Sequence, residues 1–577
     1  MSIREELVCA HQQGTFLEAV IRPDLHSDEE ELVAAIVSIH NDGVVDVVEE
    51  FDGLVGTPGF PFFLARRIFE EALPQLHSPL PEIMRCVARL FAGAGQDLAA
   101  GTVIGAFGLF LDRDPGRPAA ALAEIHADSE NLIDLIPCVL ESGSRANGAA
   151  FIREAVALCR NENTAIRQRA VFSLGRMNVS EDPNLSEEVL LALEERIENE
   201  TDDSVLAAAL KSGFELIQRG TDPDGRSSAL ITRVAEKAGP ITLHAVAEVL
   251  AFHPTEVPDS LWDALALHLP RIDPGNRGTV DLLDHVAYSQ FDAGRTAQAQ
   301  AVLESVLQAH GGKLSMEAFD STTFWVAGHP DVLGSIMTRW FLKGDPSLCG
   351  AVAQMVAAHH GSALVLEVDS AQLTDSDAAT LVYLAKKAVG YLFFHSPSAA
   401  SVVVSLMRCA RDASTMEALS GLLLDPLLLS YSGEARQYLD SVAREEPDFV
   451  SQALERTLAH LDAYLQGLSG ARDLAALRPS EAHREAQHRN MSRRMSESWK
   501  AAEANSVILN LVTRNVLLYG RRSVDYYAGY DGETHRTENE LQAHSFELEL
   551  PRLASFDPVG LDYTLRVFRA ERLKQCD

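Results

Sequence analysis

Cysteine is scarce in this sequence, with seven residues among 577, at positions 9, 86, 138, 159, 349, 409 and 576. The number is odd and no two cysteines have the C-x-x-C spacing, which argues against a disulfide framework or a zinc cluster. The motifs of common enzyme classes are also absent: Walker A, G-x-G-x-x-G after a strand, H-E-x-x-H and G-x-S-x-G. We therefore expect no metal, no cofactor and no catalytic residue, although these absences do not exclude every enzyme.

Long apolar runs and aromatic residues are also rare. No stretch reaches the roughly 18 apolar residues that a membrane-spanning helix needs, and the first residues, MSIREELVCAHQQG, do not resemble a signal peptide. An aromatic content of 7% with abundant Ala and Leu favours stacked helices over a β-sandwich. We expect a folded cytoplasmic protein that does not enter a membrane.

Basic residues are outnumbered, which gives a formal net charge of -34. The first 480 residues contain 35 basic and 68 acidic side chains, so nearly all of the excess lies there. Charge of this sign repels nucleic acid and anionic membranes and favours a basic partner protein, whereas simple solubility is the alternative explanation.

An internal repeat is visible between residues 161 and 220, where NENTAIRQRAVFSLGRM is followed 39 residues later by ETDDSVLAAALKSGFELI. A polar turn precedes each copy, Asn163-Thr164 in one and Asp202-Asp203 in the other. Three aligned pairs carry the match: Ile166 with Val205, Ala170 with Ala209, and Ser173 with Ser212. A period near 40 residues is typical of paired helices that bury their apolar faces by stacking on neighbouring pairs.

The second helix of the first copy has two distinct faces. With Ser186 as the expected N-cap, the apolar face comprises Val189, Leu190, Leu193 and Ile197. The opposite face carries Glu187, Glu188, Glu194, Glu195 and Glu198. From this acidic face we select Glu187, Glu194 and Glu198 as candidate partner-binding residues.

These features resemble HEAT or armadillo-type repeats, in which a polar turn leads into a helix with a small residue at a close helix crossing. The segment Asp345-Pro346-Ser347-Leu348 opens another candidate unit. Such families often have a basic residue where Arg167 stands, but the second copy has Leu206, which puts a continuous polar ladder in doubt. The resemblance implies a mainly α protein, an α-solenoid of HEAT-like helix pairs. The alternative is a generic helical bundle with a chance duplication.

The sequence predicts four regions. Residues 1–310 form a HEAT-like solenoid, and residues 311–470 continue it after the irregular stretch GGKLSMEAFDSTTFWVAGHP. Residues 471–505 form a polar linker or strut helix with Met491, Met495 and Trp499 on one side. Residues 506–577 form a small β-hairpin plus helix module, a cap or a docking module, with a turn at Asp531-Gly532 and a helix start at Asp557-Pro558. Trp325 and Trp340 are expected in the core.

Three functions remain open. The leading hypothesis is a non-catalytic scaffold or adaptor whose acidic solenoid receives a basic segment of another protein. The first alternative is an enzyme or regulatory subunit with a site near residues 311–330 or in the C-terminal module. The second is nucleic-acid binding through Arg484, Arg489, Arg493, Arg494, Arg521 and Arg522, which the interleaved Glu481, Glu485 and Glu497 disfavour. The sequence does not indicate an oligomeric state.

Overall fold

The computed structural model divides the chain into two compact units, unit 1 (Met1–Leu314) and unit 2 (Ser315–Asp577). The division falls within the irregular stretch 311–330 predicted from the sequence, close to its beginning. The residues described are 2–22, 29–54, 60–95, 98–177, 179, 183–220, 224–359, 364–374, 376–471, 474, 479–504, 514–518, 522–528, 534–540 and 549–573.

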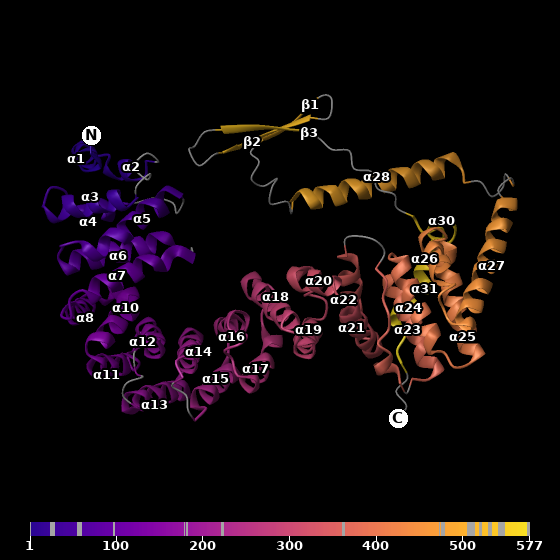
Figure 1. The fold of residues 1–577 in the computed structure, drawn as a ribbon, viewed down its shortest axis with the longest axis horizontal. Coiled ribbons are helices and arrows are strands. Elements are labelled where there is room, and N and C mark those ends of the chain that lie inside the picture. Colours follow the sequence, from indigo (N-terminus) through magenta and orange to yellow (C-terminus); the bar gives the residue numbers. More distant parts are fainter. Residues whose placement is uncertain are drawn as a thin grey trace. The chain divides into compact units, whose positions relative to one another are not determined.

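Unit 1 is built from helices (Figure 1). In chain order they are α1 (Ile3–Gln13), α2 (Phe16–Val20), α3 (Glu29–Asn41), α4 (Val47–Asp52), α5 (Phe60–Ala72), η2 (Leu73–Gln75), α6 (Leu80–Ala94), η3 (Leu98–Gly101), α7 (Thr102–Asp112), α8 (Arg117–Ala127), α9 (Ser129–Leu132), η4 (Ile133–Leu135), α10 (Ile136–Ala146), α11 (Gly148–Leu158), α12 (Thr164–Arg176), α13 (Pro183–Asn199), α14 (Asp203–Gln218), α15 (Arg226–Lys237), α16 (Pro240–Phe252), α17 (Asp259–Ala266), η5 (Leu269–Arg271), α18 (Arg277–Asp292) and α19 (Thr296–His310).

Unit 2 combines helices with one antiparallel sheet. Its elements are η6 (Met316–Ala318), α20 (Asp320–Ala327), α21 (Pro330–Lys343), α22 (Pro346–Ala357), η7 (Ser370–Leu373), α23 (Ala378–Leu392), α24 (Ser396–Cys409), α25 (Ala413–Leu422), the π-helical turn η8 (Leu423–Leu428), α26 (Glu434–Val442), α27 (Asp448–Ala471), α28 (Glu481–Ala504), β1 (Arg514–Leu518), β2 (Arg522–Ala528), β3 (Thr534–Glu540), α30 (Leu553–Phe556) and α31 (Pro558–Ala570).

The helices of unit 1 stack in two rows, as in a helical-repeat array. Helices α10, α12, α14, α16 and α18 contact one another in succession, and α11, α13, α15 and α17 form the neighbouring row (Figure 1). Hydrogen bonds between successive layers join residues at a recurrent separation, 38 positions for Arg67–Glu29 and 35 for Arg169–Asp134. The period that the sequence shows once, in residues 161–220, therefore recurs in the contacts of segments whose sequences no longer resemble one another.

Small residues set the spacing between α12 and α14. A Cβ atom on Gly175 would overlap the backbone of Ser212, and the Ser212 hydroxyl donates to the Val171 carbonyl at 2.5 Å. Ser173, aligned with Ser212 in the repeat, is also fully buried. The expected close crossing at small residues is therefore present in the structure.

The polar turn before α14 connects two layers. Asp202 caps its own helix by accepting hydrogen bonds from the Ser204 and Val205 amides. Asp203 accepts from the Gly239 amide at 2.8 Å and from the Ile241 amide at 2.6 Å, at the start of α16. One turn thus satisfies amide groups at the beginning of two successive helices of the row.

An extended segment, 364–369, runs between α21 and α24. Its even-numbered residues are buried, and the hydroxyls of Ser401 and Ser405 accept from the Leu366 and Val368 amides at 2.9 and 3.0 Å. On the other side, a Cβ at Gly334 would overlap the Glu367 carbonyl oxygen. Serine hydroxyls therefore replace the neighbouring strand that would usually satisfy this backbone.

The last part of the chain returns to the helices of unit 2. The Glu549 carboxylate accepts from the Gly433 and Glu434 amides, both at 2.8 Å, at the start of α26. Further on, α31 packs against α23, and Gly390 allows the approach because a Cβ there would lie 3.1 Å from the Phe568 Cβ. The C-terminal segment 549–573 is therefore part of the unit 2 fold.

Two local expectations change, and a third cannot be compared because its residues are not described. The C-terminal β element is a three-stranded antiparallel sheet, ordered β1-β2-β3, because a third strand precedes the expected hairpin. The Asp531-Gly532 turn lies outside the described residues. Ser186 is not an N-cap, because α13 begins at Pro183, where a proline suits the first helical turn. In the described chain, no helix combines the length and apolarity needed to cross a membrane.

Candidate binding surfaces

The three glutamates selected from the sequence lie on α13, opposite its buried face, and bond to the next helix of their row. Arg226, on α15, places one nitrogen 2.6 Å from Glu187 Oε2 and another 2.6 Å from Glu194 Oε2. Arg233, two turns later, lies 3.4 Å from Glu198 Oε1. The hydrogen bonds that Arg226 donates to Glu194 and Glu187 raise the pKa of its guanidinium.

This pairing corrects the expectation that Glu187, Glu194 and Glu198 present a free acidic face. A partner that binds them must compete with Arg226 and Arg233, so their docking role stays a prediction without support from the geometry. Analysis of one helix at a time missed the pairing because the arginines lie one repeat later. The signal was nevertheless present, since the two arginines have the same seven-residue spacing as Glu187 and Glu194.

Ion pairs also join α13 to the preceding helix of the row. Arg160 lies 2.7 Å from Glu195 Oε2, and Arg153 lies 4.0 Å from Glu188 Oε2. The acidic face of α13 therefore connects α11 and α15. Exposed pairs of this kind contribute at most about 1 kcal/mol each, so their main effect is to fix the register between layers.

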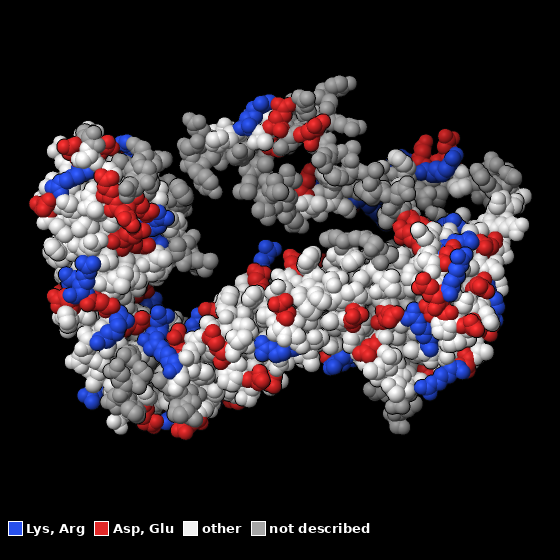
Figure 2. Space-filling model, in the orientation of Figure 1, with Lys and Arg blue, Asp and Glu red and all other residues white. Residues whose placement is uncertain are grey.

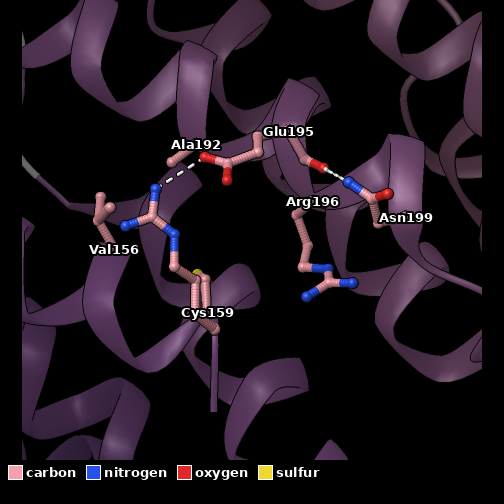
Figure 3. Close-up of a pocket in the computed structure, with 7 residues that line it drawn as sticks. Val156, Cys159, Ala192, Glu195, Arg196 and Asn199 are labelled. Atoms are coloured by element: carbon pink, nitrogen blue, oxygen red, sulfur yellow. Dashed lines mark hydrogen bonds and ion pairs between the residues drawn. The ribbon is translucent and has the colours of Figure 1, made fainter. Parts of the chain in front are cut away.

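A small cavity lies between α11 and α13, beside the Arg160–Glu195 pair (Figure 3). Its volume of about 50 Å³ leaves space for a few water molecules only. Burial raises the pKa of the Cys159 thiol to about 12, so this sulfur is protonated at neutral pH and is a poor nucleophile. The Asn199 amide donates to the Glu195 carbonyl at 3.2 Å across the same site. The contacts around this cavity therefore hold α11 and α13 together.

A second group of carboxylates lies where α3 begins and α5 ends. Burial and the charges of Glu29 and Glu30 raise the pKa of Glu71, and Arg67 donates to Glu29 at 2.9 Å. Burial is the largest cause of this raised pKa, and the charges of Glu29 and Glu30 add to it while the charge of Arg67 opposes it. Figure 2 shows acidic side chains gathered on this part of unit 1.

A shallow groove of about 340 Å³ crosses α12, α14 and α16 in unit 1. Phe172, Ala208 and Ile241 provide apolar surface along it. Its charged groups are paired, with Arg169 Nε 2.9 Å from Asp134 and Lys211 Nζ 2.7 Å from Glu248. The groove therefore offers contact area to a partner rather than free charge.

A larger groove, about 820 Å³, lies between α25 and α27 in unit 2, within the size range of ligand sites. Met416 and Phe449 line it together with Arg411 and Arg456. Arg456 donates to the Gln452 carbonyl at 3.1 Å, and within the described residues neither arginine has a carboxylate partner. Sequence reasoning missed this groove because its walls come from helices that no motif connects.

The region 311–330, proposed as an alternative site, contains the short helices η6 and α20. Trp325 stacks on His329 with ring centroids 3.7 Å apart, whereas Trp340, farther along, is fully buried as expected. A hollow of about 290 Å³ begins at Pro330 and includes Asp369. The Asp369 carboxylate caps η7 by accepting from the Ala371 amide, and hydrogen bonds from Gln372 and Ser335 lower its pKa. No group of three or more potential metal ligands occurs in the described part of the chain.

The basic residues considered for nucleic-acid binding do not form a continuous stripe where they are described. On α28, Arg489 lies 3.8 Å from Glu485, and Arg493 lies 4.0 Å from Glu497. Arg484 and Arg494 are exposed on the same helix. Arg522 lies in β2 without a described side chain, and Arg521 lies outside the described residues.

A buried lysine marks the contact between α23 and α31. Lys387 is fully buried, its pKa is lowered by burial, and its ammonium donates to the Arg569 carbonyl at 2.5 Å. Arg569 in turn donates to the Gly390 carbonyl at 2.6 Å, and Arg572 donates to the Gly344 carbonyl at the same distance. Each cation satisfies carbonyl groups at a helix end, which fixes the C-terminal segment on unit 2.

In the comparisons with known proteins, no family model and no curated protein matches the chain. An engineered protein of known crystal structure is 14% identical to this chain. The match covers 80% of this chain and 99% of the engineered protein, with a TM-score of 0.20. A circular tandem repeat protein with a novel repeat topology is 16% identical, with coverage of 82% and 99% and a TM-score of 0.15. Because these TM-scores are so low, neither likeness carries an argument. The contacts between its successive helices make the chain a mainly helical repeat protein.

Proposed function

We propose that the chain is a non-catalytic scaffold, whose unit 1 binds a basic segment of a partner protein in the cytoplasm. The observation that carries this proposal is the charge of unit 1. Residues 1–314 contain 49 acidic and 24 basic side chains, which accounts for a charge of -25 out of -34. Pairing every cation with one carboxylate would still leave 25 carboxylates unmatched. A surface of this kind attracts a basic segment.

The ion pairs support this proposal because the basic residues of unit 1 bind groups of the same fold. Arg145 pairs with Asp112 at 2.8 Å, Arg176 with Glu141 at 2.6 Å, and other arginines bind carbonyl groups, as Arg271 does at Ala238. The cations thus hold successive layers together, and the excess negative charge faces solvent. The cluster near Glu71 is the place where this excess affects a carboxyl pKa.

The repeats are of the HEAT or armadillo type in this proposal. The supporting features are a polar turn with a capping aspartate, a close crossing at Gly175 and Ser212, and a layer-to-layer period near 40 residues. In such an array, each layer adds surface to one continuous face, so an extended partner segment can contact several layers.

Affinity capture on the immobilised full chain tests the proposal. We expect proteins with basic segments to be retained in 0.1 M NaCl and released in 1 M NaCl, because the Debye length falls from about 10 to about 3 Å. The double variant Glu30→Gln/Glu71→Gln removes two carboxylates of the cluster and should weaken retention of those proteins.

The matched control is Glu187→Gln/Glu198→Gln, which removes two carboxylates that already have arginine partners. It should leave retention unchanged, because Arg226 and Arg233 already neutralise these two carboxylates, which therefore offer little charge to a basic partner. Capture that persists in 1 M NaCl, or partners without basic segments, would show that apolar surface rather than negative charge holds them.

A further inference from the structure

Helix α28 is exposed along its whole described length, although it carries an apolar stripe. Met491, Met495 and Trp499 lie at positions i, i+4 and i+8, and their side chains are 49% to 70% exposed. The rest of the surface is polar and includes the Glu485–Arg489 pair. A polar helix with one uncovered apolar stripe is marginally stable alone, so the stripe fits a helix that packs on a partner.

Helix α31 carries a second uncovered stripe. Leu561 and Leu565 face α23 and are buried, whereas Val559, Tyr563 and Val567 lie on the other side and are 42% to 79% exposed. These three residues also lie at i, i+4 and i+8. The helix is therefore apolar on two sides, and only one of them is covered.

A hydrogen bond connects α28 to α30, the short helix that the non-helical residue Asp557 separates from α31. Gln487 Nε2 lies 3.5 Å from Ser555 Oγ, and each of these residues precedes its stripe by four positions in the sequence. The two residues are 68 positions apart. The same offset aligns Met491 with Val559, Met495 with Tyr563, and Trp499 with Val567. Two parallel helices that start from this contact would therefore bring the stripes together along three successive turns.

We propose that α31 is a helix-binding surface whose occupant is the α28 segment of the same chain, docked in parallel and in this register. The side chains that flank the stripes are compatible with close packing. At 100° per residue, one flank of each stripe carries small residues, Ser492 and Ser496 on α28 and Gly560 and Thr564 on α31, and the other flank carries Arg494 and Ser498 on α28 and Asp562 and Arg566 on α31. The charged pair Asp562–Arg566, 2.8 Å apart, lies at the edge and keeps its exposure to water.

Cysteine cross-linking in the full chain tests the register. The pairs Met491→Cys/Val559→Cys and Met495→Cys/Tyr563→Cys place sulfurs within disulfide reach in the docked arrangement. The off-register pair Met491→Cys/Val567→Cys is the matched control, two turns out of alignment. We expect at least tenfold faster intramolecular disulfide formation for the in-register pairs, measured by peptide mapping after oxidation.

Two outcomes would overturn the proposal. Equal rates for in-register and off-register pairs would show that the helices do not dock in this alignment. Disulfides that link two chains would show that the occupant of α31 is a second copy.

Trp499 gives an independent measurement that does not depend on cysteine chemistry. Docking covers its indole, so Tyr563→Asp, a substitution at an exposed position, should shift the tryptophan emission of the protein to the red and increase quenching by acrylamide. The other three tryptophans, Trp262, Trp325 and Trp340, lie outside α28 and α31 and contribute equally in all variants. The neighbouring Asp562→Asn should change neither, and circular dichroism shows whether each variant retains its helices. An unchanged emission in Tyr563→Asp would count against docking.

Discussion

Asp203 contributes more to the fold than a residue in a surface turn usually does, because it caps a helix in the next layer. Its carboxylate accepts from the Gly239 and Ile241 amides and from the Thr242 hydroxyl. We expect Asp203→Ala to lower the free energy of unfolding by about 1 to 2 kcal/mol, the usual cost of a lost helix cap. Urea denaturation measures this free energy, and Asp281→Ala, at an exposed position, is the control. Equal effects of the two variants would contradict the role of Asp203 as a cap.

His40 makes the stability of unit 1 depend on pH. Burial lowers the pKa of His40 below 6.5 despite the nearby Asp46, and its Nδ1 accepts from the Val47 amide at 3.2 Å. The unfolded chain, with a histidine pKa near 6.5, therefore binds a proton first as the pH falls. Stability from this group is complete at higher pH and decreases as the pH falls through about 6.5 toward the folded-state pKa.

The variant His40→Asn keeps an acceptor near the Val47 amide and removes the titration. Its free energy of unfolding should fall less steeply than that of the parent between about pH 7.5 and 5.5, measured by denaturant titration at each pH. The exposed His126→Asn is the control. A slope that equals that of the parent would exclude His40 as the source.

At the scale of helices, the α12–α14 crossing depends on Gly175. Any side chain there meets the Ser212 backbone, which cannot move away as a flexible side chain can. Gly175→Ala should therefore separate the helices and destabilise the protein by about 1 to 3 kcal/mol, the range for overpacked cores.

Gly105, within α7, is the matched control for this substitution, because a Cβ there would meet no atom within 4 Å. Gly105→Ala should be neutral or stabilising by up to about 1 kcal/mol, since alanine favours the helix. Thermal unfolding of both variants distinguishes the effects. If the Gly175→Ala variant is as stable as the parent, α12 and α14 are farther apart at this crossing than the structure shows.

Sequence reasoning reached the elements that local patterns determine. The alignment of Ser173 with Ser212 led to the helix crossing, and Asp557-Pro558 led to the cap of α31, where Asp557 accepts from the Gly560 amide. It failed where the deciding contact lies far away in the chain. Glu194 looked free because its partner, Arg226, is 32 positions away, and no local pattern connects Lys387 with residue 569.

At the scale of the molecule, the C-terminal segment is bonded into unit 2. Lys386 pairs with Glu571 at 2.9 Å, and Lys387 and Arg569 bind carbonyls across the α23–α31 contact. Leu561 and Leu565 are buried there as well. These contacts of the described segment all lie within residues 315–577, so their loss should leave unit 1 unchanged.

A chain that stops after Phe556, which removes α31, should show this separation in calorimetry. Burial of two leucines alone is worth about 3 to 6 kcal/mol, so the unfolding transition of unit 2 should move down by roughly 10 °C. The transition of unit 1 should keep its temperature, because its layers bond to their own neighbours. A chain that stops after Leu573 keeps every described contact of α31 and serves as control. If both transitions shift together in the shorter chain, the two units unfold as one cooperative body, and the C-terminal segment stabilises the whole protein.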